Sequence, residues 1–270
     1  MTAVCRCAPH VRTRFGSGGD LIPHEHRVVR PKTPGELHSA FAMGARVIGG
    51  GAGIMSAAMP AEPPALGMDL GALGLHTVAS DSGRVGALVR LAELQRTRLD
   101  GHNAVAAALA ATATPAVRRV ITVGGVLGAR MHRSDLVPAL AVHGARAHVV
   151  TAASPEPRWL PVLGLWDLTD PFAVLHVDLG APGHSAFRRL AGHQTVAPAL
   201  VTAAGLRRAD GSLVVCLGAA TPRPVLLDAD QLPPAGSFLE DHRASAQYRR
   251  EMAAVLVAEL AEELSVVEAA

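Results

Sequence analysis

Between residues 121 and 128 the chain reads Ile121-Thr122-Val123-Gly124-Gly125-Val126-Leu127-Gly128. Paired glycines after a β-branched run allow backbone angles that other residues resist, and they let a ligand approach the bare main chain. Together with the Thr122 hydroxyl and the carboxylate of Asp135, backbone N–H groups at such a turn could hold a polar, phosphorylated ligand. Gly-Gly pairs are also common in ordinary turns, so this segment alone leaves both interpretations open.

A second glycine-rich segment lies earlier in the chain and reads Val47-Ile48-Gly49-Gly50-Gly51-Ala52-Gly53-Ile54. It predicts a short strand that runs into a loop with almost no side chains. The loop does not match the dinucleotide fingerprint Gly-x-Gly-x-x-Gly, because Ile54 stands where a small residue is required. Neither segment has the Gly-x-x-x-x-Gly-Lys-Ser/Thr pattern of nucleotide-triphosphate loops. The two segments therefore predict a pair of strand-to-loop turns of another kind.

The composition is that of an ordinary globular chain. With 270 residues, 49% of them hydrophobic and 18% charged, the chain is long enough for one large or two modest domains. The 25 basic residues nearly balance the 23 acidic ones, which argues against a nucleic-acid or membrane-surface role driven by charge. Aromatic residues make up only 3%, too few for base-stacking platforms. We therefore expect neither a nucleic-acid nor a membrane partner.

The cysteines and histidines do not predict a metal site. Three cysteines cannot form a disulfide framework, and Cys5-Arg6-Cys7 lacks the companion ligands of a zinc or iron–sulfur site. His24-Glu25-His26 likewise has no evident third ligand. The chain contains no apolar run of the roughly 18 residues that span a membrane, and residues 1–20 carry arginines without the apolar core of a secretory signal. We expect a cytoplasmic protein.

Local signals place several elements. Thr33 is a plausible helix N-cap, with Pro34 suited to the first turn and Glu36 three residues on, and this helix should run to about Gly44. Near the C-terminus, apolar residues at helical spacing predict a long helix over 244–264. A further helix is expected after the segment 84–94, extending towards Arg98, and another over 104–111. Strands are expected over 28–30, 47–48, 65–70, 146–150, 173–179, 199–206, 212–217 and 219–225.

The two glycine segments resemble those of the FAD-binding medium (M) subunits of the molybdenum hydroxylases, the family of carbon monoxide dehydrogenase and xanthine dehydrogenase. In that family the first loop reads roughly Ala-Gly-Gly-Thr-Asp-Leu, and the second reads Thr-Ile-Gly-Gly-Asn with Asp-x-x-Pro-Ala-Leu shortly after. Here the second is followed by Asp135-Leu136-Val137-Pro138-Ala139-Leu140. The segment Arg84–Leu94 resembles the family's Ile-Gly-Ala-x-Thr-Thr-x-x-Glu-Leu, and Ser245-Ala246-Gln247-Tyr248-Arg249-Arg250 matches its C-terminal Ser-Ala-x-Tyr-Arg-Arg. The resemblance spans residues 28 to 264.

The resemblance implies an α+β fold. After a polar tail over 1–27, it implies an FAD-binding domain of the PCMH-like type over 28–180, made of two α/β subdomains at about 28–80 and 81–180. A C-terminal α/β domain over 181–270 would follow, with a three- or four-stranded sheet and a long C-terminal helix.

The resemblance also implies a flavoprotein whose cofactor is FAD. The first loop would hold the diphosphate through its backbone N–H groups, the second would hold the ribityl and adenosine side, and an aromatic residue would lie near the isoalloxazine. The implied cofactor-binding residues are Gly49, Gly50, Gly51, Ala52, Gly53, Ile54, Thr122, Gly124, Gly125, Asp135 and Trp166, with Phe172 as second choice for the aromatic. No catalytic residue and no metal ligand is implied.

Three positions depart from the family pattern, namely Ala52, Gly53 and Val126, where the family usually has hydrogen-bonding side chains. Each loss is worth roughly 0.5–1.5 kcal/mol. Arg130, His132 and Arg133 follow the second loop and either compensate at the phosphates or are solvated loop charges.

Three functions follow as hypotheses. The first is an electron-transfer subunit that takes electrons from iron–sulfur partners through FAD to an acceptor, while a molybdopterin subunit oxidises the substrate. The alternative is a stand-alone flavoenzyme, an oxidase or dehydrogenase, or a non-redox enzyme of a specialised biosynthetic pathway, working as a homo-oligomer. The third is a flavin-free interaction protein.

Overall fold

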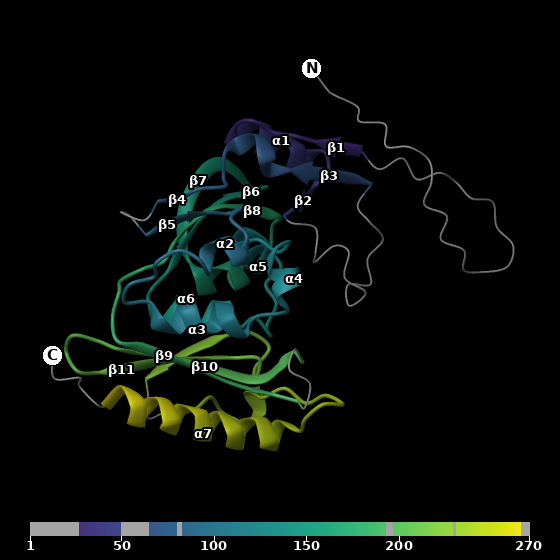
Figure 1. The fold of residues 1–270 in the computed structure, drawn as a ribbon. Coiled ribbons are helices and arrows are strands. Elements are labelled where there is room, and N and C mark those ends of the chain that lie inside the picture. The colour runs from purple at the N-terminus through teal and green to yellow at the C-terminus, as the bar shows by residue number, and fades with distance from the viewer. Residues whose placement is uncertain (1–26, 50–64, 80–82, 193–196, 229–230, 266–270) are drawn as a thin grey trace, which may run out of the picture.

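The computed structural model describes residues 27–49, 65–79, 83–192, 197–228 and 231–265. Apart from Arg27, the tail expected over 1–27 lies outside these ranges. The described residues form three sheets with helices between them and a long helix at the C-terminal end (Figure 1). This mixed α and β architecture is the one expected.

The first sheet is small and parallel, with strand order β1-β3-β2. Its strands are β1 (Arg27–Val29), β2 (Arg46–Ile48) and β3 (Leu66–Asp69); helix α1 (Pro34–Ala42) connects β1 to β2, and the 3-10 helix η1 (Leu70–Leu73) follows β3. As predicted, Thr33 is the N-cap of α1, and its hydroxyl accepts a hydrogen bond from the N–H of Glu36 at 3.2 Å. Leu37, Ala40 and Phe41 bury one face of this helix in the main core.

The second sheet is antiparallel and has five strands in the order β4-β5-β8-β6-β7. Its strands are β4 (Val78–Ala79), β5 (Arg84–Gly86), β6 (Arg146–Thr151), β7 (Ser154–Pro161) and β8 (Phe172–Asp178), with the 3-10 helix η2 (Val162–Asp167) between β7 and β8. The strands predicted over 146–150 and 173–179 are β6 and β8. The central strand β8 is almost continuously buried, because helix α5 (Val123–Gly128) packs on it.

Five short helices occupy the segment between β5 and β6: α2 (Leu91–Leu94), α3 (Asn103–Ala111), α4 (Pro115–Arg118), α5 (Val123–Gly128) and α6 (Leu136–Val142). The prediction that the first of these extends towards Arg98 is wrong, since α2 ends at Leu94. Every residue of α6 is buried, because this helix contacts η2, α3 and two strands of the third sheet, β10 (Ala199–Arg207) and β11 (Leu213–Gly218).

The third sheet is antiparallel, with strand order β12-β11-β10-β9. Its elements are β9 (Ser185–Ala191), β10 (Ala199–Arg207), β11 (Leu213–Gly218), β12 (Val225–Asp228), the 3-10 helix η3 (Ala235–Ser237) and α7 (Ala246–Ser265). Helix α7 covers one face, and α3 and α6 lie against the other (Figure 1). Strand β10 therefore reads as a continuous apolar run rather than an alternating one.

One strand prediction in this region is wrong. Residues 219–224 form turns rather than a strand, and β12 begins only at Val225. Pro222 and Pro224 have no N–H to donate to a ladder, and Ala219 takes a positive φ of 60°. Strand β9 was not predicted at all. The four-stranded sheet and the long helix α7 agree with the expected architecture.

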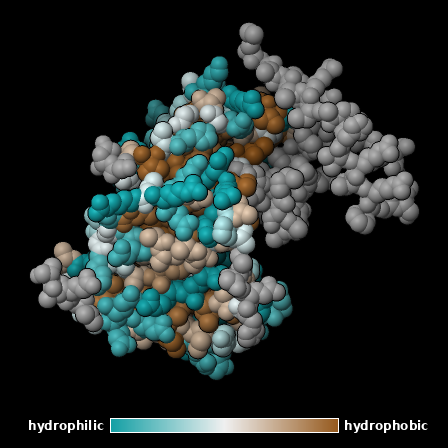
Figure 2. Space-filling view, viewed as in Figure 1, coloured by the Kyte–Doolittle hydropathy of each residue, from teal (hydrophilic) through white to brown (hydrophobic). Residues whose placement is uncertain are grey.

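The buried side chains form two clusters. The larger one joins the first two sheets with helices α1, α2, α3, α5 and α6, and it reaches the inner face of the third sheet. The smaller one lies between that sheet and α7. The proposed domain limits near residues 80 and 180 stay a prediction. On the face shown in Figure 2, hydrophobic residues are scattered among hydrophilic ones. Within the described ranges, no helix has the length and apolar character needed to cross a bilayer.

Candidate functional site

The two glycine-rich segments meet in space. Gly49 ends the described part of the first segment just after β2, and a Cβ atom placed on it would lie 3.2 Å from the Cα of Gly125 and 3.2 Å from the Thr122 hydroxyl oxygen. The fold thus brings the end of β2 against the start of α5. Gly50, Gly51, Ala52, Gly53 and Ile54, which were predicted to contact a diphosphate, lie outside the described residues.

The second glycine segment is a helix, so the predicted strand-to-loop turn is wrong here. Thr122 is the N-cap of α5, and its hydroxyl accepts a hydrogen bond from the Gly125 N–H at 3.1 Å. The residues before it form α4, which begins at Pro115 with Thr114 as its N-cap. Extended structure is limited to an isolated bridge between Thr122 and Arg90. Thr114 and Thr122 thus cap helices with their hydroxyls, and this segment does not form the predicted strand.

The start of α5 is joined closely to the segment after β5. The N–H of Val123 donates to the Val89 carbonyl and the N–H of Gly124 donates to the Ala87 carbonyl, both at 2.9 Å. A Cβ on Gly124 would lie 2.5 Å from the Ala87 Cβ, so only glycine fits there. Since Gly125 donates to Thr122, the first three N–H groups of α5 are satisfied within the protein. This end of α5 offers bare main-chain surface rather than free donors.

The contact between Gly49 and Gly125 brings together the two glycine segments that were predicted to hold FAD. Two main-chain segments without Cβ atoms lie side by side, and the Thr122 hydroxyl stands between them. A flat or narrow group can approach such a surface more closely than it can approach side chains. The described residues are therefore compatible in shape with the cofactor. The sequence predicted that Gly124 contacts the ligand, but a glycine is needed there because the position packs tightly against Ala87.

Asp135 lies just before α6 and is 6% exposed. Its Oδ1 accepts a hydrogen bond from the Arg189 Nε of β9 at 3.1 Å. Burial raises the pKa of Asp135 to about 6, although Arg189 acts in the opposite direction. The carboxylate thus links α6 to the third sheet. Its predicted contact with the cofactor stays a prediction.

Trp166 lies in η2, half-buried, and packs against the main core. Helix α5 contacts η2, so the indole belongs to the same region as the second glycine segment. Arg130 joins these two elements, because its Nη1 donates to the Leu168 carbonyl at 2.7 Å and its guanidinium lies 5.3 Å from the ring centre of Phe172. The roles of Trp166 and Phe172 beside the isoalloxazine remain predictions.

The two arginines that follow the second glycine segment are held by the protein itself. Arg130 binds the η2 region, and Arg133 forms an ion pair with Asp241 at 2.9 Å. Burial lowers the pKa of His132, and the neighbouring Arg133 lowers it further. The sequence did not reveal the partners of these arginines, because they are distant in the chain. Leu168 lies 38 residues from Arg130, and Asp241 lies 108 residues from Arg133. The sequence did give a signal for Ala87, because it belongs to the segment Arg84–Leu94, which resembles a family motif.

In the described part of the chain, no group of three or more His, Cys, Asp or Glu side chains is placed to hold a metal ion. Chemically, the described part of the site offers main-chain surface and a threonine hydroxyl.

Comparison with known proteins identifies relatives. A family model described as "FAD binding domain in molybdopterin dehydrogenase" matches residues 24–167, more than half of the chain. Among curated proteins, none matches the sequence significantly.

Three solved structures share the fold. Quinoline 2-oxidoreductase from Pseudomonas putida 86 is 20% identical with a TM-score of 0.73, and the match covers 88% of this chain and 96% of that one. Reconstituted CO dehydrogenase from Oligotropha carboxidovorans is 17% identical with a TM-score of 0.74, over 90% of this chain and 98% of that one. Carbon monoxide dehydrogenase from Hydrogenophaga pseudoflava is 18% identical with a TM-score of 0.71, over 87% and 95%.

Proposed function

Since the chain belongs to the family of FAD-binding domains of molybdopterin dehydrogenases, we propose that it is the electron-transfer subunit of a molybdenum hydroxylase. FAD is the cofactor of this family, and bound FAD supplies the redox chemistry. The observation that carries the proposal is the contact of Gly49 with Gly125 and Thr122, which joins the two glycine segments that resemble the family's cofactor loops.

The protein's own residues would bind and orient the cofactor. Gly49 and Gly125 present main chain without side chains, and the Thr122 hydroxyl fixes the start of α5 by capping it. The carbonyls of Ala87 and Val89 hold the same helix from the other side. These contacts make the surface rigid before the ligand arrives, which reduces the entropy that binding would otherwise cost.

We propose iron–sulfur and molybdopterin subunits as partners. One solved structure of the same fold is described as a Cu,Mo-CO dehydrogenase, which supports a molybdenum centre in the assembly of that protein. Electrons would reach this chain from an iron–sulfur partner and leave it for an acceptor whose identity is open. The substrate would be oxidised in the molybdopterin subunit.

A visible spectrum of the purified chain tests the cofactor. We expect flavin absorbance near 450 nm, and mass analysis of the released cofactor should identify FAD rather than FMN. A chain that is colourless and stays colourless after incubation with FAD would contradict the proposal. Co-expression with an iron–sulfur subunit then tests the electron-transfer role, since reduction of the partner's clusters should bleach the flavin. A flavin that is reduced directly by a small-molecule substrate would instead support the stand-alone alternative.

A further inference from the structure

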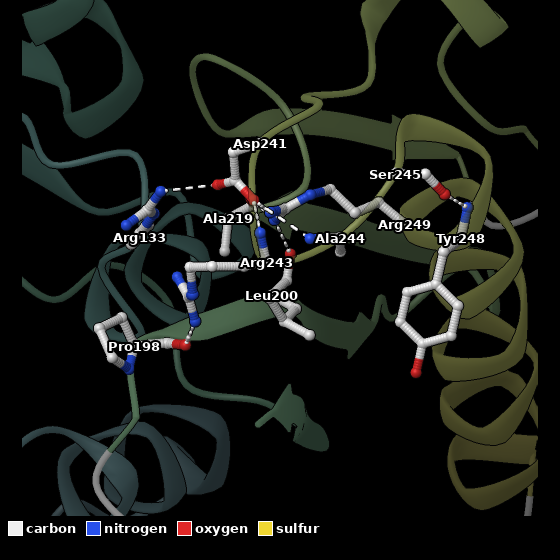
Figure 3. Close-up of polar contacts among 10 residues, drawn as sticks. All are labelled: Arg133, Pro198, Leu200, Ala219, Asp241, Arg243, Ala244, Ser245, Tyr248 and Arg249. Atoms are coloured by element: carbon white, nitrogen blue, oxygen red, sulfur yellow. Dashed lines mark hydrogen bonds and ion pairs between the residues drawn. The ribbon is translucent and has the colours of Figure 1, made fainter. Parts of the chain in front are cut away.

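Four arginines converge where the loop after α5 meets the third sheet. Arg133 comes from that loop, Arg189 from β9, Arg243 from the segment before α7, and Arg249 from α7 itself. We call them the arginine cluster. Figure 3 shows Arg133 and Arg249 approaching the carboxylate of Asp241 from opposite sides, at 2.9 Å and 2.7 Å. The side chain of Arg243 extends to the Pro198 carbonyl.

The arginine cluster carries more positive charge than its neighbours balance. Its four guanidinium groups are permanently charged, whereas two carboxylates contact them, Asp241 and Asp135. Burial acts to raise the pKa of Asp241, but the Arg243 N–H and Arg249 outweigh it and lower that pKa to about 2, so this carboxylate is ionised. Four positive charges against two negative ones leave an excess of two.

Several donors in the cluster have no acceptor among the described residues. The Nε atoms of Arg133 and Arg249 and the Nη1 of Arg243 are all buried without a hydrogen-bond partner. Arg249 is fully buried, and its other nitrogens already donate to Asp241 and to the carbonyls of Leu200 and Ala219. Buried polar atoms are nearly always paired in folded proteins. Such a concentration of unpaired cationic donors calls for an anion.

The cluster is reached from the surface at one side. The side chain of Arg133 is 30% exposed and that of Asp241 is 21% exposed, whereas Arg249 behind them is 0% exposed. Arg243 is also only partly buried. An incoming anion would therefore meet Arg133 and Arg243 first, and their side chains would turn towards it with the buried charge of Arg249 behind.

We propose that the arginine cluster binds a small oxyanion, phosphate or the phosphate group of a small organic ester. The planar guanidinium fork matches the spacing of phosphate oxygens and binds them with two parallel hydrogen bonds. Phosphate, with a charge close to minus two, also balances the excess charge. Gly49 lies against the start of α5, whereas Arg133 follows the end of this helix. The proposal therefore does not depend on the proposed electron-transfer function.

Thermal unfolding of the purified chain, measured with FAD added in excess and without it, tests the site. Inorganic phosphate at millimolar concentration should raise Tm above the value in sodium chloride of equal ionic strength. Arg243→Gln should weaken the apparent phosphate affinity by about tenfold or more, because it removes one bidentate donor. Arg250→Gln is the matched control, because Arg250 is an exposed arginine on α7 outside the cluster and should respond to phosphate as the natural chain does.

Arg133→Gln provides a second variant if Arg243→Gln alone proves unstable, and it should weaken phosphate binding in the same way. Glycerol phosphate identifies the source of the anion: tighter binding than inorganic phosphate indicates an organic ester, and equal or weaker binding indicates the free ion. The proposal is overturned if phosphate stabilises the chain no more than chloride does, or if the Arg243 and Arg133 variants bind phosphate as tightly as the control.

Discussion

Gly49 and Gly125 lie so close together that a methyl group on Gly49 would come within 3.2 Å of the Gly125 Cα. This contact fixes the distance between the end of β2 and the start of α5, and with it the width of the surface offered to the cofactor. We therefore expect side chains at Gly49 to act on FAD binding. Gly49→Ala requires a shift of a few tenths of an ångström, whereas the larger Gly49→Val must separate the two segments.

We predict that Gly49→Val weakens FAD binding by about tenfold or more, corresponding to at least about 1.4 kcal/mol, and that Gly49→Ala has a smaller effect in the same direction. Titration of the apoprotein with FAD, followed by flavin fluorescence, measures both. Gly128→Ala is the control, because a Cβ there meets nothing within 4 Å at the far end of the same helix. Equal FAD affinity in Gly49→Val and the natural chain would show that the contact does not shape the site.

Substitution of Gly124 tests whether this glycine is needed for packing rather than for contact with the ligand. A Cβ at this position would lie 2.5 Å from the Ala87 Cβ and 2.9 Å from the Ala87 carbonyl oxygen. Gly124→Ala should therefore destabilise the fold by about 1–3 kcal/mol, the usual cost of overpacking. By contrast, Gly128→Ala should stabilise it by about 0.5–1 kcal/mol, because helical glycine is entropically unfavourable. Urea denaturation compares the two, and equal stabilities would contradict the packing role of Gly124.

What the sequence revealed depends on the range of the interactions involved. Thr33 with Glu36, and the apolar spacing of α7, are local signals, and both elements were predicted correctly. The second glycine segment was predicted as a strand and turn because its β-branched residues favour extended structure. Two interactions fix a helix there instead. One is the N-cap made by the Thr122 hydroxyl, and the other is the hydrogen bond from the Gly124 N–H to the Ala87 carbonyl, which joins segments that are distant in the sequence.

The polar partners of the site were beyond local sequence signals altogether. Asp135 pairs with Arg189, which is 54 residues away, and Arg133 pairs with Asp241, which is 108 residues away. Nothing in the spacing of either pair distinguishes them from solvated surface charges. The C-terminal Ser-Ala-x-Tyr-Arg-Arg match was visible in the sequence, but only the fold shows that Arg249 is its buried member and Arg250 its exposed one.

Arg249 should therefore be the residue of that segment on which stability depends. It is 0% exposed and donates to Asp241, Leu200 and Ala219. Arg249→Met leaves the carbonyls of Leu200 and Ala219 without this donor, while Asp241 keeps its ion pair with Arg133, so we expect a loss of about 1–3 kcal/mol. Arg250→Met, one position further on the exposed face, should change the free energy of unfolding by less than about 0.5 kcal/mol. Similar losses in both variants would show that burial does not distinguish them.

His143 should make stability fall in mild acid. Burial lowers its pKa below 6.5, the Ala181 carbonyl partly opposes this, and the His102 ring at 4.6 Å lowers the pKa further. Below about pH 6.5 the unfolded chain therefore binds more protons than the folded one, so stability present above that pH is lost as the pH falls. His143→Gln should reduce this slope by up to about 1.4 kcal/mol per pH unit. His76→Gln, at an exposed position, is the control and should leave the slope unchanged when unfolding is measured from pH 7 to 5.

Asp135 should change the folding stability in the opposite direction, and over a lower pH range. Its pKa is raised from 3.8 to about 6, mainly by burial, with Arg189 opposing. Between these values the folded chain holds a proton that the unfolded chain has lost, so this contribution is complete below about pH 3.8 and disappears as the pH rises through about 6. At 1.36 kcal/mol per pKa unit the full change is on the order of 3 kcal/mol.

Asp135→Asn should remove this contribution, whereas Asp100→Asn, at a position whose side chain is 73% exposed, should not. Urea unfolding at intervals from pH 4 to 6 measures the difference between each variant and the natural chain. If the natural chain instead gains stability over this range relative to Asp135→Asn, the attraction of Arg189 outweighs burial, and the carboxylate is ionised throughout.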